Sequence, residues 1–245
     1  MRSTISLGGF DVVLGRLDAW PAGPDDSGTP AAAWPAGQDD SGTPAAALPP
    51  AQREHWLVHA DGRRDALPVR RWHGPPEPAI ESVAARCTGP TIDLGCGPGR
   101  LTMALAQRGL VALGVDISAE AVRLTQDRGV VALRRDVFEP LPGEGRWAHA
   151  LLVDGNIGIG GDPVRLLRRC GDLIAADGTL VVEVDPPGAG LWQGQAYVLS
   201  CSRRGSAFSW ARVGVEAMDR TAAAAGMRVV DGFRSGPRWF TELAR

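Results

Sequence analysis

The stretch TIDLGCGPGR, residues 91–100, constrains the fold of this chain more than any other feature of its sequence. A short apolar run that carries one acid, Asp93, breaks into a turn with glycines at alternate positions, Gly95, Gly97 and Gly99. Glycine adopts left-handed backbone conformations at little steric cost and lets a ligand approach the main chain closely. The stretch therefore predicts a strand that leads into a turn able to hold a nucleotide-like ligand.

Short apolar runs alternate with helical patterns from residue 91 onward, which predicts a parallel sheet covered by helices on both faces. The expected strands are TIDLG, VALGVD, VVALRRD, HALLVD and GTLVVEVD, and the expected helices cover about 77–87, 99–109, 118–128 and 163–176. Ser118 and the pair Asp162-Pro163 are typical helix starts. In the last of these helices, four side chains recur at helical spacing and are expected to face the sheet: Val164, Leu167, Cys170 and Ile174.

Hairpin signals flank this alternating region. Asp61-Gly62 separates HWLVHA from DALPVRRW, which predicts a hairpin with a two-residue turn. After the core, QAYVLSC indicates an irregular strand, and a helix is expected over about 210–225. The last two runs, RVVDGF and RWFTELA, are expected to pair across RSGP because no helical pattern separates them.

The amino-terminal part is of low complexity. Residues 20–33, WPAGPDDSGTPAAA, recur almost unchanged as residues 34–47, and their composition offers little to bury, which predicts a linker. The preceding ISLGGFDVVLGRLDAW is a candidate amphipathic helix that packs over the domain as a lid. We therefore expect an extension over 1–50, a hairpin or cap region over 51–76 and the main domain over 77–245.

Composition excludes several classes of function. The formal net charge is -2, which offers nothing to attract nucleic acid or an anionic membrane. The four cysteines form no metal-binding cluster, so we expect free thiols and no metal site. All 26 basic residues are arginine, which excludes a P-loop or Schiff-base lysine. No apolar run is long enough to cross a bilayer, and the amino terminus is a poor signal peptide, so we expect a cytoplasmic protein.

Acidic residues gather where the expected strands end. Asp116, Asp136, Asp154 and Asp185 each follow an apolar run, and Asp93 precedes the glycine turn. Ligands of open parallel sheets bind beyond the carboxyl ends of the strands. Asp116 follows the turn by about 20 residues, the position from which a carboxylate accepts hydrogen bonds from both hydroxyls of a ribose.

The spacing of the glycines distinguishes between nucleoside ligands. The pattern is GxGxG rather than the dinucleotide fingerprint GxGxxG, with Arg100 at the place of the last glycine. Pro98 lacks an amide that a phosphate would need, and Asp93 repels phosphate but suits a cation. The turn therefore favours a cationic nucleoside.

These segments carry a family resemblance. IDLGCGPGR with GVDIS resembles the first two motifs of the class I S-adenosylmethionine-dependent methyltransferases, and RRDVFEPLP and LLVDGNIG resemble the third and fourth. The likeness covers about residues 77–245. It implies a Rossmann-like, doubly wound α/β fold with a mostly parallel seven-stranded sheet and a C-terminal antiparallel hairpin. It also implies methyl transfer with S-adenosylmethionine as the cofactor.

The resemblance also implies a cofactor site, in which Asp93 lies near the methionine amino group and Asp116 holds the ribose. Ile117 would pack on the adenine, Asp136 would accept from its amino group, and the Val137 amide would donate to a ring nitrogen. The remaining residues implied are the three turn glycines Gly95, Gly97 and Gly99, Cys96 among them, and Asp154, Gly155 and Asn156, which line the methionine end.

The methyl acceptor and any catalytic residue stay open. A small molecule is favoured over nucleic acid, because the Asp-Pro-Pro run at 185–187 is followed by Gly188 rather than by the aromatic that stacks on a flipped base. Asp154 and Asp185 are better placed as a general base than His149, which lies near the start of its strand. The histidines of the hairpin region, His55, His59 and His73, are further candidates.

Two alternatives remain at this stage. A nicotinamide-dependent oxidoreductase on a similar sheet is disfavoured by the glycine spacing and by the absence of a Tyr-xxx-Lys pair. A non-catalytic domain that binds the cofactor or a protein partner is compatible with the same motifs, because a fold does not prove turnover.

Overall fold

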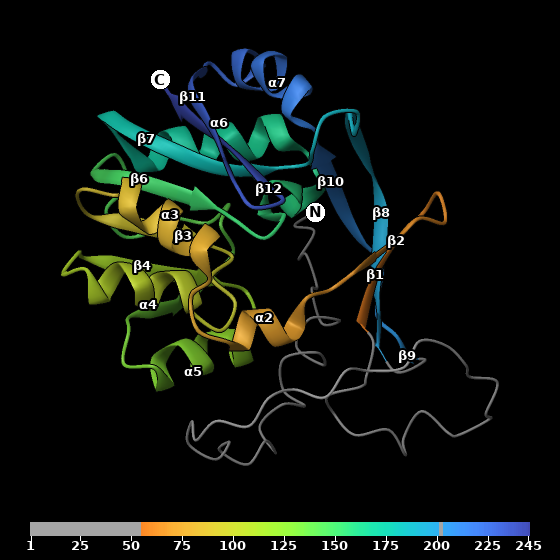
Figure 1. The fold of residues 1–245 in the computed structure, drawn as a ribbon, viewed down its shortest axis with the longest axis horizontal. Coiled ribbons are helices and arrows are strands. Elements are labelled where there is room, and N and C mark those ends of the chain that lie inside the picture. The colour runs from red at the N-terminus through yellow and green to blue at the C-terminus, as the bar shows by residue number, and fades with distance from the viewer. Residues whose placement is uncertain (1–54, 201–202) are drawn as a thin grey trace.

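The computed structural model describes residues 55–200 and 203–245, which form two β-sheets, the larger at the left and the smaller at the right of Figure 1. The candidate amino-terminal helix and the duplicated linker lie outside the described residues. Within the described ranges, no helix combines the length and the apolar character needed to cross a membrane.

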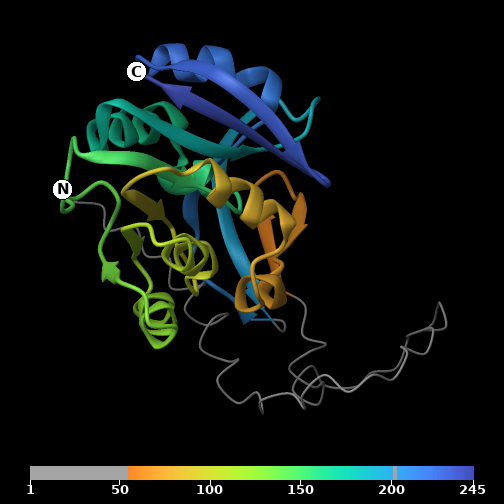
Figure 2. The same ribbon diagram turned by 60° about the vertical axis from the view of Figure 1, so that its left-hand side comes forward.

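The larger sheet has seven strands in the order β11-β12-β7-β6-β3-β4-β5. Its strands are β3 (Thr91–Leu94), β4 (Ala112–Asp116), β5 (Ala132–Arg134), β6 (Trp147–Leu152), β7 (Ile174–Val184), β11 (Arg228–Ser235) and β12 (Arg238–Ala244). β3 to β7 run parallel, whereas β12 pairs antiparallel with β7 and β11. The mostly parallel seven-stranded sheet with its C-terminal hairpin is therefore confirmed, and the hairpin is the blue pair beside α7 in Figure 2.

Helices cover both faces of this sheet. They are α3 (Pro78–Arg86), α4 (Arg100–Gln107), α5 (Ala119–Asp127), α6 (Pro163–Leu173) and α7 (Met218–Ala224). Successive side chains of a strand point to opposite faces, and β6 shows the consequence. Leu151 packs in the apolar cluster with α3 and α4, whereas Leu152 packs in the cluster with α6 and α7.

Two helix starts agree with the sequence. The Ser118 hydroxyl accepts a hydrogen bond from the Ala121 amide at 3.0 Å, and the Asp162 carboxylate accepts one from Arg165 at 3.0 Å. The expected buried face of α6 is correct for Leu167 and Cys170. It is wrong for Val164, which is only half-buried, because Leu166 and Leu173 are the side chains that the helix buries instead. Ile174 was expected in the same helix, but it is the first residue of β7.

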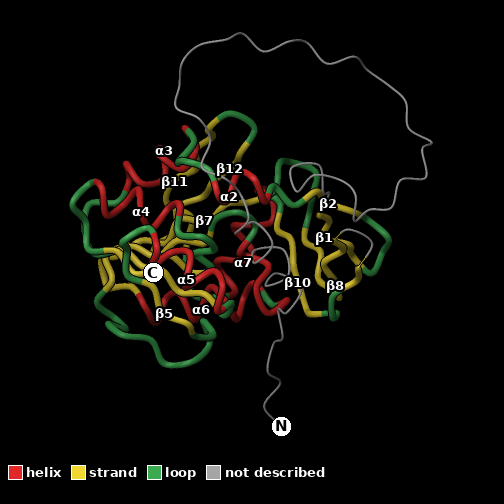
Figure 3. Tube along the Cα trace, turned by 90° about the horizontal axis from the view of Figure 1, so that it is seen from below, coloured by secondary structure: helices red, strands yellow, loops and turns green. Residues whose placement is uncertain are grey.

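The smaller sheet is antiparallel, with the order β10-β8-β1-β2 and β9 paired to β8. Its strands are β1 (His55–His59), β2 (Arg64–Ala66), β8 (Leu191–Ser200), β9 (Arg203–Arg204) and β10 (Phe208–Val213). We call it the cap sheet, and Figure 3 shows it at one side of the helices and strands of the larger sheet. Three of the five strands of the cap sheet, β8, β9 and β10, thus come from a segment between β7 and α7, far in sequence from the expected cap region at 51–76.

Three local expectations are corrected in the cap sheet. The turn at Asp61-Gly62 is longer than two residues, because Gly62 takes φ +86° and its amide donates to the His59 carbonyl. The second arm stops at Ala66, and residues 69–73 form the short helix α2 (Val69–His73) after Pro68. β8 is a regular ten-residue strand rather than an irregular one, and Cys201 lies outside the described residues.

The helix expected over 210–225 is wrong in its first half. Residues 208–213 form β10 instead, because Phe208 and Trp210 alternate onto the inner face of the cap sheet and pack with Leu57 and Val198. Only a 3-10 turn, η4 (Val215–Ala217), and α7 are helical there. Pairing with β8 has therefore overridden the local helical pattern.

Candidate functional site

The glycine turn joins β3 to α4 at the carboxyl edge of the larger sheet. Gly95, Gly97 and Gly99 all have positive φ, at +76°, +53° and +80°. A Cβ on Gly95 would lie 2.5 Å from the Asn156 side chain, and one on Gly99 would lie 2.5 Å from Thr125. A Cβ on Gly97 meets nothing within 4 Å. Gly97 thus presents open backbone to the cavity described below, whereas its two neighbours are constrained by protein packing.

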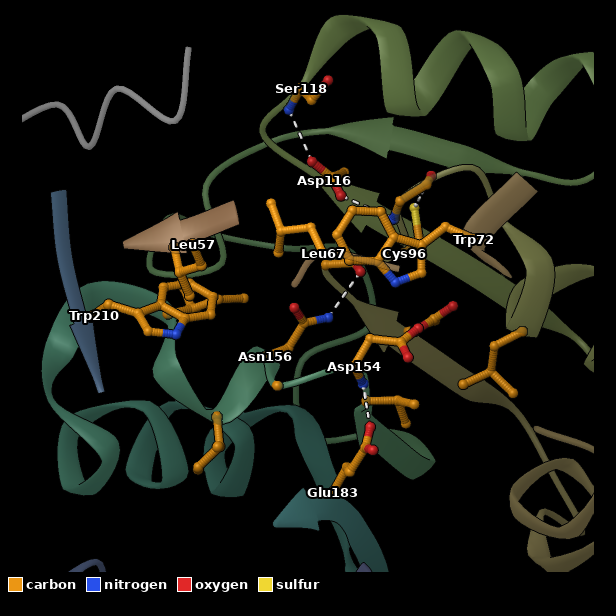
Figure 4. Close-up of a pocket in the computed structure, with 18 of the residues that line it drawn as sticks. Leu57, Leu67, Trp72, Cys96, Asp116, Ser118, Asp154, Asn156, Glu183 and Trp210 are labelled. Carbon is orange, nitrogen blue, oxygen red and sulfur yellow. Dashed lines mark hydrogen bonds between the residues drawn. The ribbon is translucent and has the colours of Figure 1, made fainter. Parts of the chain in front are cut away.

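Asp116 ends β4 beside this turn. One carboxylate oxygen accepts a hydrogen bond from the Gly97 amide at 2.9 Å, and the other accepts from the Ser118 amide at 2.9 Å (Figure 4). These two backbone donors fix the side chain before any ligand binds. Asp116 and the following Ile117 both line the cavity, so the structure brings them together with the glycine turn.

Asp136 and Val137 follow the next strand, β5, and line the same cavity. The Asp136 carboxylate accepts from the Phe138 amide at 3.0 Å, which holds this loop in a compact turn. The Val137 side chain is buried and its carbonyl accepts from Arg169 at 2.8 Å. Both residues are thereby held at the cavity wall beside Asp116, because β5 pairs with β4.

Asp93 lies within β3 and is buried almost completely, at 2% exposure. Its carboxylate accepts a hydrogen bond from the Thr102 hydroxyl at 2.8 Å. Burial raises the pKa of Asp93 to about 7, against the lowering effect of the Thr102 bond, and the nearby carboxylates of Asp154 and Asp116 raise it further. A cation bound in the cavity would favour the charged form of this acid.

Cys96 lines the cavity but packs mainly against protein. A Cβ on Gly114 of β4 would lie 2.8 Å from its sulfur, so the glycine at that position makes room for the thiol. Burial raises the pKa of Cys96 well above its ordinary value, which keeps the sulfur protonated. Its surroundings suit a packing role more than a chemical one.

The segment Asp154-Gly155-Asn156 follows β6 and turns sharply. Asp154 has φ +58°, a strained value for a residue with a side chain, and Gly155 has φ +85°. The Nδ2 of the Asn156 side chain donates to the carbonyls of Leu94 at 3.0 Å and Gly95 at 2.8 Å. Asn156 therefore ties the end of β6 to the glycine turn, a role that the sequence did not indicate.

A network of ion pairs joins this segment to distant parts of the chain. Arg100 and Arg238, exposed by only 3% and 7%, each donate to Asp154 at 2.8 Å and each pair with Glu77. Arg238 also donates to Glu183, whose carboxylate accepts from the Asp154 amide. This network could not be predicted from the sequence, because its members are separated by up to 161 positions and carry no local motif.

A cavity of about 420 Å³ runs from the glycine turn to the inner face of the cap sheet. All the expected cofactor residues except Gly99 line it. In Figure 4, Asp116 lies above Asp154 near the middle of the view, and Leu57 and Trp210 lie to the left of both. The volume is in the range of small-molecule sites. One continuous cavity thus connects the glycine turn and the acids of the sheet edge with an apolar compartment.

The histidines lie apart from the cavity lining. His149 sits near the start of β6, as the sequence indicates, where its ring accepts from the Thr88 amide at 3.1 Å. Burial lowers the pKa of His149. His59 bonds to Asp65 at 2.7 Å, and Asp65 itself lines the cavity.

Comparisons with known proteins agree with this architecture. The methyltransferase domain family matches residues 92–178. The chain is 42% identical over 65 residues to trans-aconitate 2-methyltransferase of Rhodococcus jostii (strain RHA1), and 45% identical over 67 residues to that of Mycolicibacterium gilvum (strain PYR-GCK). Each alignment covers 26% of this chain and 26% of the relative, so the match spans about a quarter of the curated relatives' length.

Solved structures share the fold over a longer stretch. An S-adenosylmethionine-dependent methyltransferase from Bacteroides fragilis, in complex with S-adenosyl-L-homocysteine, has a TM-score of 0.65 at 20% identity and covers 78% of this chain and 87% of its own. The CcbJ methyltransferase from Streptomyces caelestis has a TM-score of 0.54 at 20% identity, covering 71% and 91%. The family match places a methyltransferase domain over residues 92–178, and the sheet order belongs to the fold that these solved methyltransferases share.

Proposed function

We propose that the whole protein is a methyltransferase that uses S-adenosylmethionine and acts on a small-molecule acceptor. The observation that carries the proposal is the continuous cavity, which has the glycine turn and Asp116 at one end and the apolar inner face of the cap sheet at the other. A donor and a small acceptor bound in it would be neighbours. The near-neutral net charge supports an acceptor other than nucleic acid.

The residues present fit the cofactor. The open Gly97 backbone gives room for a ligand at the turn, and Asp116 is held by two amides at the ribose position implied by the family resemblance. Asp93, Asp154, Gly155 and Asn156 complete the end where the resemblance places the methionine part. We also propose that Ile117, Asp136 and Val137 contact the adenine.

The cofactor would supply an activated methyl group, so the chain's own task is to orient the acceptor and exclude water. Leu57, Trp72 and Trp210 line the cavity and provide apolar surface for that purpose. Alignment of two reactants can contribute about 7–11 kcal/mol in favourable cases. A conspicuous catalytic triad is therefore not required.

Calorimetry with S-adenosylmethionine and S-adenosyl-L-homocysteine tests the proposal. We expect both to bind, and Asp116→Asn to weaken each at least tenfold, because the variant loses the charged acceptor for the ribose hydroxyls. Asp172→Asn, on the exposed side of α6, should bind like the wild type. Binding of NADH without binding of either methionine nucleoside would instead support the oxidoreductase alternative.

A further inference from the structure

The cap end of the cavity combines an apolar wall with a few charged side chains. The apolar lining comes from the cap sheet, α2, the loop that joins them and η3 (Asn156–Gly161): Leu57, Leu67, Trp72, Ile159 and Trp210. Such a wall suits an acceptor with an apolar or aromatic body. The polar groups that remain determine which functional group that body carries.

Most carboxylates at this end already have donors on both oxygens. In Asp65 one oxygen bonds to His59 at 2.7 Å and the other accepts from Arg63 at 3.0 Å. Both oxygens of Asp154 and of Glu183 are held in the ion-pair network. These three acids are therefore committed to contacts within the protein.

Asp185 differs from them. It follows β7 at the carboxyl edge of the larger sheet and lines the cavity. Arg212 of β10 donates to its Oδ1 at 2.6 Å, which fixes the carboxylate, while Oδ2 has no hydrogen-bond donor within residues 55–200 and 203–245. A half-buried carboxylate oxygen without a donor favours a ligand that brings one.

The arginines at this end are matched by acids. Arg212 lies between Asp185, at 2.6 Å, and Asp65, at 3.8 Å. Arg71 lies within 3.6 Å of Glu77 and 3.4 Å of Asp154. A carboxylate-bearing acceptor would have to compete with these acids for each guanidinium, whereas a cationic acceptor would meet the open oxygen of Asp185 directly.

We propose that the acceptor is an amine carried on an apolar or aromatic body, and that its nitrogen bonds to Oδ2 of Asp185, which takes its proton. This inference rests on the proposed methyl transfer and names its acceptor class. An aliphatic amine enters as an ammonium ion, whose lone pair is occupied by a proton. Transfer of that proton to Oδ2 yields the neutral amine and a carboxylic acid, and the freed lone pair is then the nucleophile.

The surroundings of Asp185 suit this proton transfer. Burial raises the pKa of Asp185 to about 6, close to the pH at which a general base acts efficiently. The charged groups that face it come from four elements and the turn before β2: Arg212, Arg63, Asp65, Glu183 and Glu216. Arg63 lowers this pKa, whereas Asp65, Glu183 and Glu216 raise it, so the carboxylate is charged at neutral pH but readily protonated.

A matched set of probes tests the inference without knowledge of the natural substrate. Phenethylamine, phenethyl alcohol and hydrocinnamate share an aromatic body and differ in the terminal group. In calorimetry on the full chain saturated with S-adenosyl-L-homocysteine at pH 7.5, we expect the amine to bind at least tenfold more tightly than the carboxylate. Asp185→Asn should reduce amine affinity about tenfold and change alcohol affinity by less than twofold.

The possible results distinguish failure of the proposed methyltransferase function from failure of the amine inference. Failure of S-adenosyl-L-homocysteine to bind the wild type would contradict the proposed function itself. If it binds but the amine binds no better than the other probes, or none of the three binds, the amine inference is overturned. Equal loss of amine and alcohol affinity in Asp185→Asn would show a structural role and also overturn it. Asp172→Asn is the control that should leave all affinities unchanged.

Discussion

Replacing Asp93 by asparagine tests whether burial of this acid, which lies in β3 before the glycine turn, makes the stability of the fold depend on pH. Its carboxyl is fully buried and its pKa is raised to about 7 by burial, so the folded chain keeps the proton to a pH at which the unfolded chain has lost it. Stability must then fall as pH rises from about 4 to about 7, because the native state binds more protons over that interval. Asparagine resembles the protonated acid in shape and can still accept the Thr102 hydrogen bond, but it does not titrate.

The size of the effect follows from the shift. A rise of the pKa from 3.8 to about 7 corresponds to about 4 kcal/mol of lost stability once the folded acid is fully ionised. Between pH 5 and pH 8 the loss is about 2–3 kcal/mol, because part of it has already occurred at pH 5. The free energy of unfolding of Asp93→Asn relative to wild type should therefore increase by that amount over this interval.

Urea unfolding of both proteins at pH 5 and pH 8, without ligand, measures the difference. Comparison with the wild type removes the contribution of other titrating groups, Asp185 among them. A difference between the two proteins that does not change with pH, or that changes in the opposite direction, would refute the argument from burial. The same variant should bind S-adenosylmethionine more weakly at pH 8, since it lacks the negative charge proposed to face the methionine amino group.

Two further variants probe the turn and the ion-pair network. Gly95→Ala should destabilise the fold by about 2 kcal/mol or more, because the new Cβ would meet the Asn156 side chain and the residue has positive φ. Gly97→Ala should cost only about 1–2 kcal/mol of backbone strain, but its Cβ should block the cofactor. Thermal unfolding measures the loss of stability and calorimetry the loss of cofactor binding, and equal losses of stability in the two variants would contradict the packing argument. Arg238→Gln should cost about 1.5–3 kcal/mol, because it removes the buried guanidinium that pairs with the half-buried Glu77, Asp154 and Glu183. Exposed Arg64→Gln should cost less than about 0.5 kcal/mol in the same urea unfolding, and similar values for the two variants would show that the network contributes little.

The sequence predicted the larger sheet well because its signals are local. Apolar runs that end in an acid and helices that start at Ser118 and Asp162 are specified by neighbouring residues, and the structure confirms them. The cap sheet was predicted poorly. β10 has a pattern compatible with a helix, and only its pairing with β8 makes it a strand.

The same division applies to the candidate site. The motif residues around Gly97 and Asp116 could be named from spacing alone, and the structure gathers them along one cavity. Glu77 and Arg238 could not be found, because each carries no signal until the fold places them beside Asp154. The hydrogen bonds from Asn156 to the turn were missed for the same reason.

The sequence by itself determined the α/β class, the glycine turn and the kind of donor that turn favours, since each depends on residues a few positions apart. Only the tertiary structure decided that two distant segments, 55–66 and 191–213, form one cap sheet, and that Asp185 meets the cavity with one oxygen held by Arg212. Contacts between residues far apart in the chain have no local pattern, because the energy that selects them comes from packing and pairing after the elements have formed.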